Sequence, residues 1–252
     1  MINIADINRF GDELEQSLKL RTHPIAVKML KSEDEIPEGA LRPRRDNGNH
    51  LAQCQAFSLS RRQGTTVAML RDDHWCFAAL LAYGLEKKDE NDEFIKMVAN
   101  FPMFDYGKYV GVLTAPLQKA ASEPDVVLVY AEPAQVRQML VWIKMSQRTL
   151  VTTVFDPIDS CAYSIIPSMQ TGEYRITFPD PGEQARAAAR EDEVIFSIPA
   201  PKLPGFMEAF SRMKDMEKDS PWPHIVVTPD FPRPDFYAKQ FKKWGLETGP
   251  KE

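Results

Sequence analysis

Three cysteines are the residues of this chain with the most distinctive chemistry. Cys54, Cys76 and Cys161 are an odd number of thiols in 252 residues, so they cannot form a fully paired set of disulfides. Thiolates are soft ligands that favour iron–sulfur clusters, Zn²⁺ and Cu⁺. A [4Fe–4S] cluster held by three thiolates keeps one iron without a protein ligand, and that iron can act as a Lewis acid. The leading hypothesis is therefore a cluster on these three cysteines.

Two histidines widen the choice of metal. His50 precedes Cys54 by four residues, so that both can share one face of a helix, and His74 lies two residues before Cys76 at a turn. A mixed Cys/His set is typical of zinc sites. Against both metals stands the interpretation that the three thiols are plain core residues, because cysteine is among the most buried residue types. The sequence leaves cluster, zinc and no metal open.

Basic residues offer candidates for binding an anionic group of a substrate. Arg44 and Arg45 lie in a polar loop, and arginine presents a planar fork that matches a carboxylate or phosphate. Lys28 stands in an otherwise apolar run, where it could face a pocket. Each has a simpler interpretation as well, since charged loops are usually solvated and strands alternate their faces.

The elements that must position these side chains alternate between helix and strand. Apolar residues recur every three or four positions over 4–18, which predicts a helix, and 25–30 is predicted as a strand. This alternation predicts an α/β or α+β fold with a mixed β-sheet and packed helices. Helices are predicted at 51–63, 77–83, 134–146, 160–167 and 206–216, and strands at 65–70, 109–114, 126–130, 150–155, 175–178 and 194–198.

The chain divides by composition near residue 218. Residues 1–218 are predicted to form a single compact domain, whereas 219–252 is rich in proline and aromatic residues. That composition predicts an extended C-terminal arm, laid across the body or a partner subunit, and with it a homodimer. The predicted anchors of the arm are Trp222, Phe231, Phe236 and Trp244.

Composition excludes several classes of protein. The chain is 43% hydrophobic and 27% charged, as globular proteins are. A net charge of −5 argues against electrostatic binding to nucleic acid or to an anionic membrane. Apolar runs are shorter than a membrane span, and the first residues do not resemble a signal peptide, so a cytoplasmic protein is predicted. Phosphate-loop, dinucleotide, zinc-helix and nucleophile-elbow motifs are absent from the sequence.

The segment 50–84 carries the most specific pattern. It holds a Cys-Gln-Ala helix, a turn ending in glycine, a β-prone run, a second cysteine opening a helix, and a Gly-Leu pair: Cys54-Gln55-Ala56, Gly64, Thr65–Leu70, Cys76 and Gly84-Leu85. In this pattern the chain resembles a widespread prokaryotic family, domain of unknown function 169. The resemblance covers about residues 20–215 through later matches: Pro124–Tyr130, Pro133-Ala134-Gln135, Cys161, Thr171-Gly172-Glu173, Phe178-Pro179, Gly182 and Asp192-Glu193.

The resemblance bears on the ligand set. It places all three cysteines in family motifs, but where relatives carry a further cysteine near Gly182 this chain has Pro179-Asp180-Pro181. The family implies no activity of its own. Two functions are therefore weighed. The first is a cytoplasmic metalloprotein whose [4Fe–4S] cluster keeps an open iron for a small-molecule substrate or for electron transfer. The alternative is a non-catalytic small-molecule binding or redox-sensing protein with structural cysteines. Whether the protein is an enzyme stays open.

Overall fold

Six strands form one sheet in the computed structural model, which describes residues 3–89, 101–213 and 235–245. The chain divides into two units, residues 1–214 and 215–252, and each is described by itself. The strand order is β2-β3-β1-β4-β6-β5. The strands are β1 Ile25–Leu30, β2 Val67–Leu70, β3 Gly111–Pro116, β4 Val126–Ala131, β5 Arg175–Thr177 and β6 Val194–Pro199.

Helices precede, connect and follow these strands in the first unit. The α-helices are α1 Ile4–Leu18, α2 Pro43–Asn47, α3 Gln53–Gln63, α4 Phe77–Ala82, α6 Pro133–Gln147, α7 Ser160–Tyr163, α8 Ile166–Thr171, α9 Pro181–Ala187 and α10 Leu203–Met213. Short 3-10 turns are η1 Glu33–Glu35, η2 Arg71–Asp73, η3 Leu117–Lys119 and η4 Ala200–Lys202. The predicted class of helices packed on a sheet is confirmed. All five ladders between the described strands are antiparallel, and the parallel pairings are the isolated bridges Leu41–Val67 and Leu51–His74.

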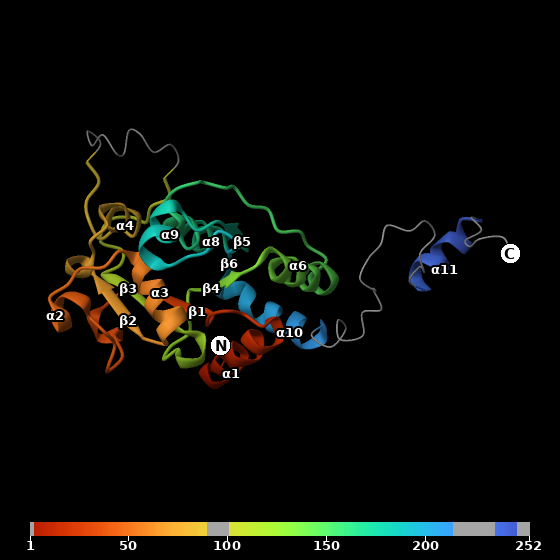
Figure 1. The fold of residues 1–252 in the computed structure, drawn as a ribbon, viewed down its shortest axis with the longest axis horizontal. Helices are drawn as coiled ribbons and strands as arrows, with labels where there is room; N and C mark the ends of the chain where they lie inside the picture. The colour runs from red at the N-terminus through yellow and green to blue at the C-terminus, as the bar shows by residue number, and fades with distance from the viewer. Residues whose placement is uncertain (1–2, 90–100, 214–234, 246–252) are drawn as a thin grey trace. The chain divides into compact units, whose positions relative to one another are not determined.

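Both faces of the sheet are covered, which explains why the central strand β4 has no alternation of apolar and polar residues. In β4, Val127 and Val129 point into a core formed with α1, α6 and α10, whereas Val126 and Leu128 point into a core that includes α4, α7 and α8. Figure 1 shows these two groups of helices on opposite sides of the sheet. A strand buried on both faces loses the usual alternation of apolar and polar residues. The candidate site lies on the second of these faces.

The long helices form where their sequence signals predict them. In α1 the buried residues are Ile7, Phe10, Gly11, Leu14 and Leu18, and the Asn3 side chain caps the first turn. Pro133 occupies the first turn of α6, where its missing N–H leaves no hydrogen bond unmade. The C-cap of α3 is Gly64 at φ 69°, a left-handed conformation that glycine adopts without strain.

The predicted strand at 150–155 does not form. Leu150 and Val154 are 76% and 78% exposed, and the backbone there is irregular. A side chain takes the place of a ladder at the edge strand β5: the Thr153 hydroxyl donates to the carbonyl of Ile176 at 2.7 Å and lies 3.3 Å from its amide nitrogen. Because those two peptide groups are already satisfied, the segment runs beside β5 without joining the sheet.

The second unit is described through α11, Asp235–Lys243. Phe236 and Trp244 are 67% and 62% exposed within it. The other two predicted anchors, Trp222 and Phe231, lie outside the described residues, so the arm and the homodimer stay predictions. Within the described parts of the chain, no helix has the length and apolarity needed to cross a membrane.

Candidate functional site

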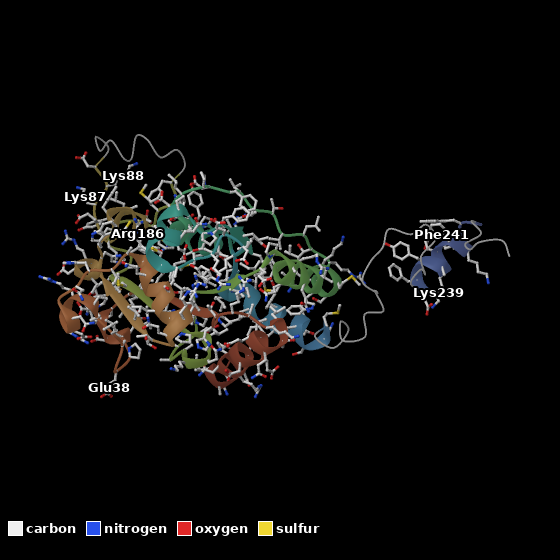
Figure 2. The ribbon with its side chains drawn as sticks, viewed as in Figure 1. Glu38, Lys87, Lys88, Arg186, Lys239 and Phe241 are labelled. Atoms are coloured by element: carbon white, nitrogen blue, oxygen red, sulfur yellow. The ribbon has the colours of Figure 1, made fainter. Side chains whose placement is uncertain are left out.

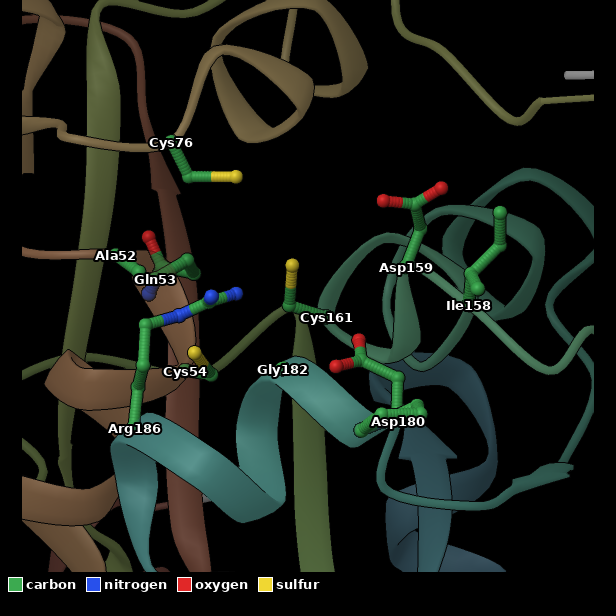
Figure 3. Close-up of a pocket in the computed structure, with 11 residues that line it drawn as sticks. Ala52, Gln53, Cys54, Cys76, Ile158, Asp159, Cys161, Asp180, Gly182 and Arg186 are labelled. Carbon is green, nitrogen blue, oxygen red and sulfur yellow. The ribbon is translucent and has the colours of Figure 1, made fainter. Parts of the chain in front are cut away.

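A pocket of about 240 Å³ brings the three cysteines together. Cys54, Cys76 and Cys161 all line it, although they come from three separate segments of the chain. Figure 3 shows their side chains facing a common space above α9. The other lining residues are Ala52, Gln53, Ile158, Asp159, Asp180, Pro181, Gly182 and Arg186. The convergence that sequence spacing alone left open is therefore present in the fold.

Backbone pairing holds Cys54 beside Cys76. The amide of Leu51 donates to the carbonyl of Asp73 at 2.9 Å, and the amide of Trp75 donates to the carbonyl of Leu51 at 2.8 Å. These two bonds tie the residues just before α3 to the residues just before α4. Cys54 then lies in the first turn of α3, and Cys76 is the residue that precedes α4. Each thiol is thus placed at the start of a helix.

Contacts with two other helices position Cys161. The Tyr83 hydroxyl, at the end of α4, donates to the carbonyl of Cys161 at 2.9 Å. The amide of Ser160 donates to Asp180 Oδ2 at 2.8 Å, just before α9. The helix itself begins after Asp159, whose φ of 58° is left-handed and uncommon for a residue other than glycine. The short α7 is therefore held between α4 and α9.

Burial disfavours the thiolate form of two of the three cysteines. Burial raises the pKa of Cys54 to about 12, and the nearby carboxylates of Glu183 and Asp180 add to the effect. Burial likewise raises the pKa of Cys161 far above its usual range. All three cysteines are free. A metal centre here would have to displace protons from these thiols, as thiolate ligation generally does.

Neither histidine lines this pocket. His50 is exposed before α3, and His74 is buried with its ring 6.4 Å from the ring of Tyr83. Burial lowers the pKa of His74 to about 4. Within residues 3–89, 101–213 and 235–245, no group of three or more His, Cys, Asp or Glu side chains is arranged to hold a metal ion.

Two carboxylates on the pocket wall differ in their surroundings. Both oxygens of Asp180 are engaged, one by Ser160 and the other by the amide of Glu183 at 2.7 Å. Asp159 Oδ2 is buried and has no hydrogen-bond partner among the described residues. Burial raises the pKa of Asp159 to about 6, and the neighbouring carboxylates of Asp180 and Asp156 raise it further in the same direction. Asp159 therefore has an oxygen available to a ligand.

The predicted basic residues lie elsewhere. Lys28 Nζ is 3.1 Å from Asp125 Oδ1, which agrees with a structural role in β1. Arg44 donates to the carbonyl of Gly48 at 2.9 Å, and Arg45 pairs with Asp46 at 2.6 Å. The structure does not bring Lys28, Arg44 or Arg45 to the cysteine pocket. Their side chains are instead satisfied by neighbours in their own segments or on the next strand.

Sequence reasoning missed Gln53 and Arg186, which line the same pocket. Arg186 follows Gly182 by four residues, so both lie on one face of α9. The sequence does contain a local signal for that helix, because Asp180 caps it directly before Pro181. What the sequence does not contain is the position of α9 relative to α3 and α7.

Comparison with known proteins gives the chain a family but no activity. A family model described as "Uncharacterised ArCR", domain of unknown function 169, matches residues 13–209. The uncharacterized protein MJ0308 of Methanocaldococcus jannaschii is 22% identical over 234 residues, covering 85% of this chain and 98% of that protein. No solved structure matches the chain. Because the family model spans well over half of the 252 residues, the chain belongs to the family of domain of unknown function 169.

Proposed function

We propose that the protein is a metalloprotein that binds a [4Fe–4S] cluster through Cys54, Cys76 and Cys161. The observation that carries the proposal is that three cysteines from distant segments line one pocket of about 240 Å³. That space is many times the roughly 10–15 Å³ that a single water molecule needs. Soft thiolates are the usual ligands of iron–sulfur clusters. Three free cysteines also fit a reducing compartment, so we propose a cytoplasmic location.

A cluster places different demands on its ligands from those of a single zinc ion. Zinc bonds to sulfur at about 2.3 Å in a tetrahedron, which requires ligand sulfurs roughly 3.8 Å apart. A cluster interposes its core of iron and sulfide between the thiolates and so accepts ligands that stand farther apart. Among the described residues no group of three or more His, Cys, Asp or Glu side chains is arranged to hold a metal ion, so the preference for a cluster rests on the shared pocket of the three cysteines and on a lining without histidine.

The chain supplies three thiolates and no fourth. The sequence contains no other cysteine, so one iron of the cluster would keep an open coordination position. Such an iron supplies Lewis-acid chemistry to a small molecule bound next to it. The protein's own residues would orient that molecule: Gln53, Asp159 and Arg186 line the same pocket. We therefore favour a small-molecule substrate over electron transfer to a partner protein.

The experiment is to purify the full chain without oxygen and to count iron, acid-labile sulfide and zinc per chain. The expected result is a brown protein with about four irons and four sulfides and a broad absorption at about 400 nm. Zinc bound to a colourless protein would show that the metal centre is a zinc site and not a cluster. A folded, colourless protein without metal would overturn both, and would leave a small-molecule binding or redox-sensing protein.

A further inference from the structure

Arg186 brings a positive charge to the cysteine pocket and forms no ion pair with the described residues. It is the one basic residue among the described residues that line the pocket. Its guanidinium makes no hydrogen bond or ion pair within the described part of the chain. Figure 3 shows the side chain extending from α9 into the space among the three cysteines. The residue is exposed, and Figure 2 labels it on the first unit. A guanidinium without such partners can bind an anion from solution.

Two neighbours hold the guanidinium in place without using its donors. Its Cζ lies 5.2 Å from the centre of the Trp75 ring, a cation–π distance. On the other side it lies against Gly182, where a Cβ would overlap Nη2 and stand 3.1 Å from Cζ. Neither contact is a hydrogen bond, so neither one uses the N–H groups of Arg186. Those N–H groups form the fork that matches a carboxylate.

Gln53 is a second and independent sign of a ligand. Its side chain is fully buried and lines the pocket, yet neither Oε1 nor Nε2 has a hydrogen-bond partner among the described residues. Buried amides in native proteins are almost always hydrogen-bonded. A polar group from outside the chain that both donates and accepts a hydrogen bond would satisfy the Gln53 amide.

Charge and size narrow the class of ligand. Asp159 and Asp180 share the pocket with Arg186, so the wall tolerates one negative charge on a ligand better than two or more. The pocket, at about 240 Å³, is smaller than the pockets of about 300–1,000 Å³ that hold drug-sized molecules, and the proposed cluster would occupy part of it, so the molecule must be small. We propose that the pocket binds a small molecule with a single carboxylate, which Arg186 holds while the Gln53 amide pairs with a neutral polar group such as a hydroxyl. This inference deepens the proposed function, since the molecule would be the substrate beside the open iron.

The competing role for Arg186 is that of a counter-ion to the thiolates or to the cluster they hold. In that role it would stabilise bound metal and would show no preference for carboxylates. A test on the metal-free chain separates the two roles, and it also keeps this inference independent of whether a cluster exists.

The test uses two alkylating reagents of matched size, iodoacetate, which carries a carboxylate, and iodoacetamide, which is neutral. The full chain, stripped of metal by a chelator and kept reduced, is labelled with each, and the rate at Cys76 is followed by peptide mass spectrometry. Cys76 lines the pocket and is partly exposed. Both reagents attack the same thiolate, so its protonation cancels in the ratio of the two rates. Glutathione gives the reference ratio for a thiol without a binding site.

The ratio of iodoacetate to iodoacetamide rates is expected to exceed the glutathione ratio by about tenfold, the lower end of what focused charge gives. Arg186→Met should return it to the glutathione value, and Gly182→Ala should lower it by displacing the guanidinium while keeping the charge. Arg137→Met, at an exposed arginine of α6 that does not line the pocket, removes the same charge and should leave the ratio unchanged.

Competition identifies the class of anion. Lactate, with a carboxylate and a hydroxyl, should slow labelling by iodoacetate more than inorganic phosphate does at equal ionic strength, and Gln53→Leu should weaken this protection. The inference is overturned if wild-type protein shows the glutathione ratio, if Arg137→Met and Arg186→Met act alike, or if phosphate protects better than lactate. Iron counts on the purified protein are a separate result, so either proposal can fail alone.

Discussion

Arg61 and Glu193 form a bidentate ion pair in the protein interior, with Nη1–Oε1 and Nη2–Oε2 distances of 2.9 and 3.1 Å. Their side chains are 0% and 2% exposed. The guanidinium also lies 4.0 Å from the centre of the Tyr130 ring, and the Tyr130 hydroxyl donates to Glu183 Oε1 at 2.5 Å. One chain of contacts therefore runs from α3, which carries Cys54, through β4 to α9 at the pocket.

Breaking this pair should destabilise the fold strongly. Arg61→Met removes the bidentate partner of the buried Glu193 carboxylate and leaves only Arg62 Nη2, at 3.8 Å, as a cation beside it. We expect the free energy of unfolding in urea to fall by about 3–5 kcal/mol. The double variant Arg61→Met/Glu193→Gln removes the stranded charge and should recover part of that loss. The interpretation fails if the single variant is within about 1 kcal/mol of wild type, the range of exposed ion pairs.

Glu183 should make stability depend on pH between about 4.5 and 7. Burial raises the pKa of Glu183 from the usual 4.5 to about 7, although hydrogen bonds from Ser160 and Tyr130 oppose the rise. The folded state then binds the proton more tightly than the unfolded state. The free energy of unfolding is therefore highest below the unfolded-state pKa of Glu183. It falls by roughly 3 kcal/mol as the pH rises to the folded-state pKa.

The control for this prediction is Glu183→Gln, which cannot ionise. Measured by urea unfolding at intervals of pH, the difference between wild type and variant should shift in favour of the variant across that range. Parallel pH curves for the two proteins would show that Glu183 does not titrate there. Asp159, whose pKa burial raises to about 6, titrates in both proteins and therefore cancels in the difference.

Gly84 and Gly48 offer a matched pair for testing how α4 is held. Both are left-handed, at φ 66° and 69°. A Cβ on Gly84 would overlap the carbonyl oxygen of Asp105, whereas one on Gly48 would meet nothing within 4 Å. Alanine at 48 should lower the free energy of unfolding by about 1 kcal/mol, the backbone strain alone. Alanine at 84 adds the overlap and should cost about 3 kcal/mol. Equal losses at the two positions would show that Asp105 moves aside freely.

Variants of residues that line the pocket should lose bound metal, whereas variants of residues outside the pocket should keep it. Cys161→Ser removes one of the three thiolates, so iron and sulfide per chain should drop to near zero in anaerobic preparations. His50→Ala should keep wild-type iron, because His50 is exposed and does not line the pocket. Loss of metal in the histidine variant, with the fold intact by circular dichroism, would point instead to a Cys/His zinc site.

Much of the fold was accessible from the sequence because its signals are local. The spacing of Ile7, Phe10 and Leu14 predicts α1, and the apolar run in β4 predicts a strand covered on both faces. The segment 150–155 misled for a nonlocal reason. Its β-branched residues favour a strand, yet the Thr153 hydroxyl satisfies both backbone groups of Ile176, and no periodicity in the segment reports that contact.

The candidate site divides in the same way. The metal-binding chemistry of cysteine follows from the residue type alone, so the three cysteines could be named as candidate ligands from the sequence. Arg186 is a candidate ligand-binding residue because Trp75 and Gly182 lie beside its guanidinium. Gln53 is a candidate because its buried side-chain amide has no hydrogen-bond partner among the described residues. Neither contact pattern can be predicted from the residue types. Conversely, Arg45 looked available in sequence, but Asp46, its neighbour, occupies it.

The wide separation of the three cysteines along the chain sets an order of events during synthesis. Cys54 and Cys76 leave the ribosome well before Cys161, which follows Cys76 by 85 residues. At about 5–20 residues per second this delay is roughly 4–17 s. Throughout that interval, the backbone contacts between Leu51 and Trp75 can at most hold Cys54 and Cys76 near each other. The part of the pocket lining that includes Cys161 has not yet been synthesised. A nascent chain therefore presents an incomplete, two-thiol site, and any occupant that needs all three must enter after α7 has docked.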